Sequence, residues 1–209
     1  MADLPPKVQK LWLKNFTAFE ETHFDFCPGI NVLIGANATG KSHVIKIIYG
    51  LLKIARGSQA PKTLKEYEVE ELAFEILSAI FQSTSVNDFI HSNKMEALVH
   101  LSCGLNELGL RIDSENEDIE PFYEVKNLPN MDSLIFLPAQ EFLSINEGFI
   151  AAYQKRELPY DETYYDLSLA LNALPLRKEQ LGDLQEVVMY LRRIIGGEQS
   201  QENEIVIQE

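Results

Sequence analysis

The chain has 209 residues, of which 45% are hydrophobic and 24% are charged, the balance of a globular chain long enough to bury a proper core. No window approaches the ~18 uninterrupted apolar residues of a membrane span, and Met1–Lys7 lacks the apolar core of a signal peptide. Cys27 and Cys103 have no CxxC or metal-spaced histidine partner, so we expect free thiols in a reducing cytoplasm rather than a disulfide or a metal site.

The net charge of −14 is unevenly distributed along the chain. Residues 1–65 carry 9 Lys and Arg against 4 Asp and Glu, whereas residues 66–209 carry 9 against 28. The basic part suits a polyanionic nucleotide as ligand. The acidic part argues against a broad DNA-binding face, although a local patch stays open.

Two antiparallel strands are predicted at the start of the chain. Val8–Phe19 indicates one strand with its continuation, and Thr22–Phe26 alternates polar and apolar residues as a second strand does. Pro28 and Gly29 then form a turn. The aliphatic run Ile30–Ile34 predicts a short buried strand that leads into a glycine-rich loop.

The glycine-rich loop has the complete GxxxxGK[ST] pattern of a phosphate-binding loop. Its residues are Gly35, Ala36, Asn37, Ala38, Thr39, Gly40, Lys41 and Ser42. A helix is predicted from His43 to Ala55, because apolar residues recur with helical spacing at positions 44, 47, 48, 51, 52 and 55. A strand, such a loop and a helix N-terminus build an anion site, because N–H groups converge on the phosphates and the helix dipole adds a favourable field.

The residue types in this loop suggest roles toward ATP and Mg²⁺. Gly35 and Gly40 permit backbone angles and a close approach that a Cβ would block. Lys41 can reach the β- and γ-phosphates, which makes it a candidate catalytic as well as binding residue. The Ser42 hydroxyl can ligate Mg²⁺, and all of residues 35–42 are candidate nucleotide-binding residues.

An acidic helix and a β-meander are predicted next. Thr63–Phe81 follows a breaker-rich loop and indicates an amphipathic helix, with an expected stripe of Leu64, Tyr67, Glu71, Phe74, Leu77 and Ile80. The candidate strands of the meander are Ala97–Leu101, Leu108–Ile112 and Phe122–Val125. We interpret the polar run Asp113–Glu120 as a solvated hairpin tip rather than a cation site.

The remainder of the chain begins with a strand and then becomes helical. Ser133–Leu137 predicts a short hydrophobic strand that Pro138 ends. Asp161–Leu174 and Leu181–Ile195 are the clearest helical segments, and Glu204–Gln208 has the composition of a strand.

Several of these motifs together resemble the start of the RecF/SMC-like ABC ATPases. Residues 11–19 are similar to the family's LxLxNFxxF strand, and residues 31–42 are similar to its NxxxGxNxxGKS loop. Asn37 matches the loop asparagine, whereas Ala38 stands where glycine is usual, which we expect to be tolerated if its φ is negative. The resemblance implies an α/β P-loop NTPase of ABC-ATPase type, with a mixed sheet, an antiparallel β-meander and a helical C-terminal segment. It divides the chain into a nucleotide-binding lobe, residues 1–140, and part of a helical lobe, residues 141–209.

A second match follows the predicted strand at Ser133–Leu137. Residues 137–142, Leu-Pro-Ala-Gln-Glu-Phe, are similar to the family's Q-loop. The resemblance implies that Gln140 approaches Mg²⁺ and the attacking water, as a catalytic residue and a metal ligand. Ala139 stands where many relatives have the Gln, so the register is open by one residue. The alternative is an ordinary exposed glutamine after a strand.

The second half of a working cassette is not recognisable. A Walker B segment needs an apolar strand followed by an Asp for Mg²⁺ and a Glu for water, and an LSGGQ-like segment completes a partner's site. Leu101–Gly104, Ile195–Gln199 and Ile205–Glu209 each carry part of such a pattern, but in the wrong order or with the wrong residues. We therefore expect the N-terminal half of the fold, and an isolated chain that binds ATP with little or no hydrolysis.

Two functional hypotheses follow. In the first, the chain is the ATP-binding half of an ABC-type ATPase, active when completed by a C-terminal half or a second subunit. The resemblance implies a homodimer or higher oligomer that couples ATP to DNA repair, antiphage defence or an effector protein; nucleic acid is an open partner and a membrane is not expected. The alternative is a non-catalytic nucleotide-sensing interaction module, which binds ATP with Mg²⁺ without turnover.

Overall fold

The computed structural model describes residues 7–58, 66–124, 134–138, 149–155, 160–172, 197–199 and 205–207. The chain divides into two compact units, one spanning Asp3–Leu134 and the other comprising Met1–Ala2 and Ile135–Glu209. None of the described helices is long and apolar enough to cross a membrane.

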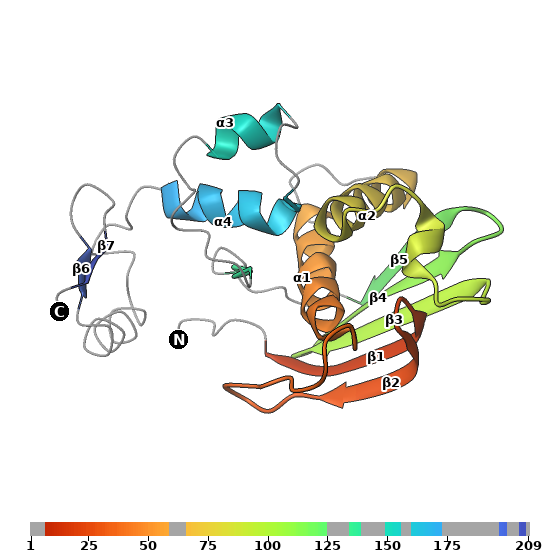
Figure 1. Ribbon diagram of the computed structural model, residues 1–209. Coiled ribbons are helices and arrows are strands. Elements are labelled where there is room, and N and C mark those ends of the chain that lie inside the picture. The colour runs from red at the N-terminus through yellow and green to blue at the C-terminus, as the bar shows by residue number, and fades with distance from the viewer. Residues whose placement is uncertain are drawn as a thin grey trace. The chain divides into compact units, whose positions relative to one another are not determined.

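The first unit is built on a five-stranded antiparallel sheet with the order β2-β1-β3-β4-β5 (Figure 1). Its strands are β1 (Val8–Phe16), β2 (Phe19–Asp25), β3 (Glu96–Cys103), β4 (Asn106–Asp113) and β5 (Asp118–Glu124). The α/β class, the opening strand pair and the β-meander are therefore confirmed; Val125, the predicted end of the meander, lies outside the described residues. The order places β1 beside β3, so the two predicted strand groups form one sheet.

One face of this sheet carries the core, because side chains alternate between the two faces of a strand. Leu11 and Leu13 of β1 and Val99 and Leu101 of β3 are at most 1% exposed. Helices α1 (Lys41–Ser58) and α2 (Glu66–Phe81) lie over this face (Figure 1). The sheet therefore buries one face and leaves the other to polar side chains, as antiparallel sheets commonly do.

The predicted helical spacing holds for α1 and fails in part for α2. Val44, Ile47, Leu51, Leu52 and Ala55 of α1 are buried as predicted, and Ile48 is half-buried. In α2 the buried stripe consists of Val69, Ala73, Ile76, Leu77 and Ile80, whereas Tyr67 is 56% exposed and Glu71 is exposed. Leu77 and Ile80 of the predicted stripe are therefore buried as predicted, and Leu64 lies outside the described residues. The prediction was wrong for Tyr67 and Glu71, because a carboxylate on the core side is costly and the helix presents an uncharged row there instead.

The prediction of a buried strand at Ile30–Ile34 is wrong. None of these residues belongs to a strand, and Ile30, Val32 and Ile34 are 90%, 73% and 91% exposed. A strand needs a neighbour for its backbone hydrogen bonds, and β1–β5 pair only with one another among the described strands of this unit.

The strand predicted at Ser133–Leu137 is wrong for its described part. Residues 134–138 have no regular secondary structure, and Ile135 and Leu137 are 53% and 74% exposed. Ser133 lies outside the described residues. The physical reason is again that no described strand pairs with this segment.

The second unit contains α3 (Phe149–Gln154), α4 (Glu162–Asn172), β6 (Gly197–Gln199) and β7 (Ile205–Ile207). The Asp161 carboxylate accepts the Thr163 N–H at 3.0 Å, which caps the start of α4. The helix predicted at Asp161–Leu174 and the strand predicted at Glu204–Gln208 are confirmed within the described residues. The helix predicted at Leu181–Ile195 lies outside them.

Candidate nucleotide-binding site

Residues 35–40 form the loop that enters α1. The Val44 N–H donates to the Gly40 carbonyl at 3.1 Å, so the hydrogen bonds of α1 begin at Gly40. Helix geometry leaves the N–H groups of the first turn without intrahelical acceptors, and the helix dipole adds a partial positive charge at the same point. Residues 41–43 therefore present N–H groups that suit an anion.

The Lys41 side chain is folded back over its own loop. Its Nζ donates to the Gly35 carbonyl at 2.8 Å and also to the Ala36 carbonyl. The Thr39 hydroxyl donates to the same Ala36 carbonyl at 2.9 Å. The ammonium thus holds the loop closed on itself, and a bound phosphate would exchange these carbonyl contacts for stronger charge-assisted ones.

Gly40 is required by two features of the loop. Its φ is +86°, in the region that favours glycine. A Cβ at this position would also lie 2.6 Å from the ring of Phe19, the first residue of β2. The turn between β1 and β2 therefore packs directly on the phosphate-binding loop, a contact that the motif does not reveal.

Ala38 corrects one expectation from the sequence. Its φ is +63°, whereas we expected tolerance of alanine on the condition of a negative φ. A residue with a Cβ in this region costs about 1 kcal/mol. The loop therefore keeps a conformation suited to the usual glycine, with alanine under strain.

Thr17, in the β1–β2 turn, joins the loop to the rest of the sheet. Its hydroxyl lies 3.0 Å from Nδ1 of His43, in the first turn of α1. Its carbonyl accepts a hydrogen bond from Nδ1 of His91 at 2.8 Å, and its N–H donates to the Phe89 carbonyl at 2.9 Å. Phe89 ends the short 3₁₀ helix η1 (Val86–Phe89). The start of α1 is thus held by a turn that is itself held by the segment before β3.

The environment of His43 favours its neutral form. Burial, and then the nearby charge of Lys46, lower the pKa of His43 from the ordinary value of 6.5. Lys46 in turn donates to the Ile80 carbonyl at 2.8 Å, near the C-terminal end of α2, where a cation is favourable. The ring of Phe81 contacts the His43 ring with centroids 5.4 Å apart.

Sequence reasoning missed the supporting residues Thr17, His43 and His91. Thr17 is 26 positions from His43 and 74 from His91, so no spacing rule connects them. The part of the sequence that could have indicated this junction is the LxLxNFxxF segment, which ends in the turn. The pattern predicted a strand there, and not its contact with the loop.

The other predicted site residues have simple placements. Gly35, Ala36, Asn37, Thr39 and Ser42 are exposed residues. Gln140, the predicted catalytic residue and metal ligand, lies outside the described residues. Three segments carry part of a Walker B or signature pattern. The first, Leu101–Gly104, ends β3 and enters a turn. The described parts of the other two, Ile195–Gln199 and Ile205–Glu209, are the strands β6 and β7, which pair with each other.

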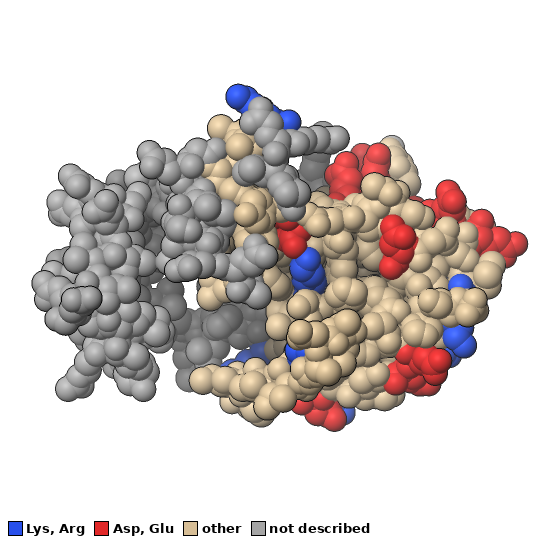
Figure 2. All heavy atoms as spheres, viewed as in Figure 1, with Lys and Arg blue, Asp and Glu red and all other residues tan. Residues whose placement is uncertain are grey.

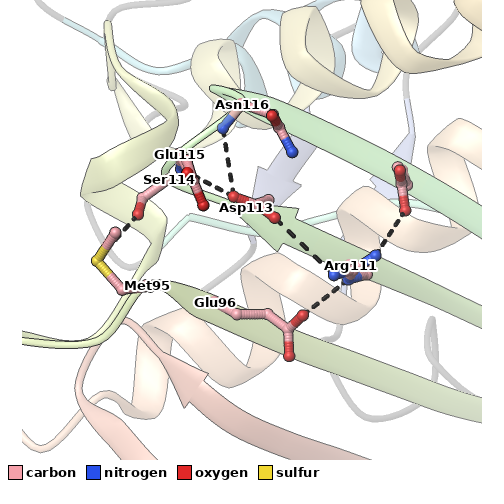
Figure 3. A network of polar contacts seen from close by, with 8 residues as sticks. Met95, Glu96, Arg111, Asp113, Ser114, Glu115 and Asn116 are labelled. Atoms are coloured by element: carbon pink, nitrogen blue, oxygen red, sulfur yellow. Dashed lines mark hydrogen bonds and ion pairs between the residues drawn. The ribbon is translucent and has the colours of Figure 1, made fainter.

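The β3-β4-β5 end of the sheet carries a separate polar network (Figure 3). Nε of Arg111 donates to Glu96 at 2.7 Å, and the guanidinium lies 3.9 Å from Asp113 and 3.6 Å from Glu120. The hydrogen bond with Glu96 and the neighbouring carboxylates raise the pKa of Arg111. The guanidinium thus links three adjacent strands on the outer face of the sheet.

The adjoining hairpin tip is acidic. Asp113 accepts the N–H groups of Glu115 and Asn116 at 2.8 Å and 3.3 Å, which shapes the turn into β5. Figure 2 shows Asp and Glu side chains gathered at this end of the sheet and over α2. The prediction of a solvated hairpin tip over Asp113–Glu120 holds only for residues 114–117, because Asp113 ends β4 and Asp118–Glu120 begin β5, where Ile119 is buried.

An α/β unit with a glycine-rich loop that leads into a helix is the hallmark of the P-loop NTPases, and this is the class to which the chain belongs. The chain belongs to the AAA ATPase domain family, which matches residues 7–163. The resemblance to RecF/SMC-like ATPases, which the sequence shows most specifically over residues 11–48, is confirmed by this family match and by the RecF relatives that follow.

Sequence relatives narrow this class further. The chain is 39% identical over 66 residues to the DNA replication and repair protein RecF of Streptococcus pneumoniae (strain CGSP14). It is 38% identical over 66 residues to RecF of strain ATCC 700669 / Spain 23F-1. In both cases the match covers 31% of this chain and 18% of the relative, so the chain spans only a part of the curated relatives that it matches.

Two solved structures are similar to the chain at 14% sequence identity. One is the recombination mediator RecF with ATP, with a TM-score of 0.43, covering 90% of this chain and 47% of that chain. The other comes from work on ATP-driven dimerization and DNA-stimulated activation of SMC ATPases, with a TM-score of 0.40, covering 88% of this chain and 98% of that chain.

Proposed function

We propose that the chain is the ATP-binding part of an ABC-type ATPase. The observation that carries this proposal is the closed loop at the start of α1, with Lys41 bonded to the Gly35 and Ala36 carbonyls. On binding ATP, Lys41 leaves these carbonyls for the β- and γ-phosphates, while the N–H groups of residues 35–42 surround the phosphate oxygens.

Ser42 is the residue of the described chain that suits Mg²⁺. Its hydroxyl is exposed and directly follows Lys41, where the P-loop serine of such ATPases holds the ion. The ion would neutralise charge on the phosphates, and the chain's own contribution is to hold the phosphates in place. Gln140, as part of a Q-loop, would be the second residue of this chain to hold the ion and would orient the attacking water.

Hydrolysis requires residues that the chain does not show. We propose that an Asp-Glu pair and a signature segment come from a C-terminal half or a second subunit, joined in a homodimer or higher oligomer. In this arrangement residues 1–140 are the nucleotide-binding lobe and residues 141–209 are part of the helical lobe. The name of the RecF relatives, DNA replication and repair protein, supports a DNA-related role. We propose the cytoplasm as its location, and antiphage defence as a second setting.

A calorimetric titration with ATP and Mg²⁺ tests the binding site. Lys41→Ala should weaken ATP binding by about 10- to 100-fold, the value of hydrogen bonds to a charged group, without changing the circular dichroism spectrum. Lys14→Ala, which removes an exposed lysine of β1, is the matched control and should bind like the wild type. Equal ATP affinity in a folded Lys41→Ala variant would overturn the site.

Phosphate release tests the catalytic part. The isolated chain should bind ATP with little or no turnover, and the completed assembly should hydrolyse it. Gln140→Ala should then lower turnover by about 10- to 100-fold with little change in ATP affinity, because its contact is made mainly in the transition state. ATP binding without turnover in the complete assembly would instead favour the nucleotide-sensing module.

A further inference from the structure

A row of aromatic and imidazole rings crosses the outer face of the five-stranded sheet, the face opposite the helices. The strand register places Trp12 of β1 directly opposite His23 of β2 on one side and His100 of β3 on the other. His100 lies opposite Gly109 of β4, which lies opposite Phe122 of β5. Directly opposed residues point to the same face of a sheet. The row therefore extends over all five strands.

The rings of this row are stacked in pairs and accessible to solvent. The ring centroids of Trp12 and His23 are 6.0 Å apart, and those of His100 and Phe122 are 6.1 Å apart. A Cβ at Gly109 would lie 2.1 Å from the Phe122 ring, so glycine allows this ring to reach across β4. The His23 side chain is 69% exposed and Phe122 is 45% exposed. Ring pairs stabilise a sheet, and exposed aromatic rings are also enriched where proteins bind one another.

Carboxylates border the aromatic row on both of its sides. Nε1 of Trp12 donates to Glu21 at 3.3 Å on one side, and Nε2 of His100 lies 3.3 Å from Glu107 on the other. Seven carboxylates but only three cationic side chains occupy the outward-facing positions of the strands in the described part of the chain. The carboxylates are Glu21, Asp25, Glu96, Glu107, Asp113, Asp118 and Glu120, and the cations are Lys10, Lys14 and Arg111.

The cations of this face do not balance its negative charge. Arg111 is shared among three carboxylates (Figure 3), and Nζ of Lys10 lies 3.9 Å from Asp25. Asp113 lies directly opposite Asp118, and like charges at opposed positions destabilise a sheet. A cationic partner would relieve this repulsion, so the charge of the face favours a basic ligand.

The combination of rings and carboxylates suits arginine better than lysine. A guanidinium group stacks on aromatic rings and pairs with carboxylates through two parallel hydrogen bonds, whereas an ammonium group acts as a point charge. Single-stranded nucleic acid also stacks on aromatic rings, but its phosphates would be repelled by the bordering carboxylates. Neighbouring strands lie about 4.8 Å apart, so the row from β2 to β5 spans about 19 Å, the length of about six extended residues.

We propose that the outer face of the sheet binds an extended, arginine-containing segment of a partner protein. The segment crosses the strands along the aromatic row. Its guanidinium groups pack on Trp12 and Phe122 and pair with Glu21 and Glu107 on the two sides of the row. The surface lies on the face of the sheet opposite α1, so this proposal does not rest on the nucleotide site.

Fluorescence of Trp12 tests this assignment, because Trp12 is the only tryptophan of the 209-residue chain. The probe is a peptide of alternating arginine and serine, about eight residues long, and the same peptide with lysine in place of arginine is its control. Both are titrated at about 0.15 M salt, where exposed charges are screened beyond ~8 Å. The double variant Glu21→Gln/Glu107→Gln removes two charges at the row. Glu71→Gln/Glu75→Gln removes two exposed charges from α2 and is the matched control.

The arginine peptide should shift the emission of Trp12 and bind at least about fivefold more tightly than the lysine peptide. Glu21→Gln/Glu107→Gln should weaken its binding about tenfold through loss of charge-assisted hydrogen bonds. The α2 control should weaken it less than about twofold, because distant exposed charges are screened. Phe122→Leu keeps the net charge and an apolar side chain opposite Gly109, and should weaken binding about threefold through loss of the ring.

Four results would overturn the proposal. Equal binding of the lysine peptide, or an equal loss in the α2 control, would show attraction by net charge alone. A shift of Trp12 emission by oligothymidylate would identify single-stranded nucleic acid as the ligand. Self-association in sedimentation experiments that is lost in Glu21→Gln/Glu107→Gln would identify a second copy of the chain. An unchanged emission with the arginine peptide at about 1 mM, the concentration of a very weak complex, would show that the face does not bind it.

Discussion

The sheet β1–β5 with α1 and α2 contrasts with the segment Phe26–Gly40 that connects them. Both are rich in Ile, Val and Leu, yet Ile47 of α1 and Val99 of β3 are fully buried whereas Ile30 and Ile34 are at least 90% exposed. The difference lies in the neighbours: each strand of the sheet has hydrogen-bonded partners within the unit. The strands of the sheet are paired within the unit, whereas the connecting segment has no strand partner among the described residues.

Truncation of one isoleucine in each region tests most directly whether the two regions differ in burial. Ile47→Ala should lower the free energy of unfolding by about 2–5 kcal/mol, because it leaves a cavity in a packed core. Ile34→Ala, an identical change at a side chain that is 91% exposed, should alter it by less than about 0.5 kcal/mol in the isolated chain. Urea unfolding followed by circular dichroism measures both. Similar losses would show that residue 34 is buried in solution.

Gly40 is the point where the two regions meet, and Gly40→Ala tests that contact. It combines a φ of +86° with a clash against the Phe19 ring, so we expect a loss of about 1–3 kcal/mol in the free energy of unfolding and weaker ATP binding.

Gly104→Ala is the matched control for this substitution, because Gly104 has a φ of +67° with open space around it. It should cost only the backbone strain, about 1 kcal/mol. Equal losses for the two variants would mean that the β1–β2 turn does not pack on the loop.

Within the connecting segment, Ala38 and Ala36 allow a comparison of alanine with and without a positive φ. Ala38→Gly should raise the free energy of unfolding by about 0.5–1 kcal/mol, since it relieves alanine at a φ of +63°. Ala36→Gly, in the same loop but without a positive φ, should lower it by a similar small amount through the entropy of the unfolded chain. Thermal and urea unfolding of both variants provide the test, and a loss of stability in Ala38→Gly would contradict the left-handed conformation.

The smallest expected effect is a pH dependence at the junction of the two regions. The pKa of His43 in the folded chain is below the ordinary value of 6.5. As the pH drops below 6.5, His43 is therefore protonated more readily in the unfolded chain than in the folded chain. The free energy of unfolding should therefore fall as pH drops through about 6.5 and level off below the folded pKa. Urea unfolding at about pH 7.5 and at about pH 5.5 measures this fall in the free energy of unfolding, which should be smaller in His43→Gln than in the wild type. If the free energy of unfolding of His43→Gln depended on pH as strongly as that of the wild type, His43 would not be the source of the pH dependence. His23→Gln, at an exposed position of β2, is the control.

The sequence by itself determined the elements whose signals are local. The pattern of residues 35–42 predicted a phosphate-binding loop, and the residue pattern along β3 and β4 predicted the meander that the structure contains, because period and turn chemistry are properties of neighbouring residues. The family resemblance, most specific over residues 11–48, was likewise a local match, and the AAA ATPase domain family and the RecF relatives confirmed it. Gln140 stays a prediction from the sequence.

Only the tertiary structure decided which apolar segments are buried and what supports the loop. Ile30–Ile34 has the composition of a buried strand, yet burial requires a pairing strand, and the described chain offers none. The contacts of Thr17 with His43 and His91, and of Phe19 with Gly40, join residues far apart in the sequence. The sign of φ at Ala38 was equally hidden, because it depends on how the loop closes around Lys41 and not on the residue type.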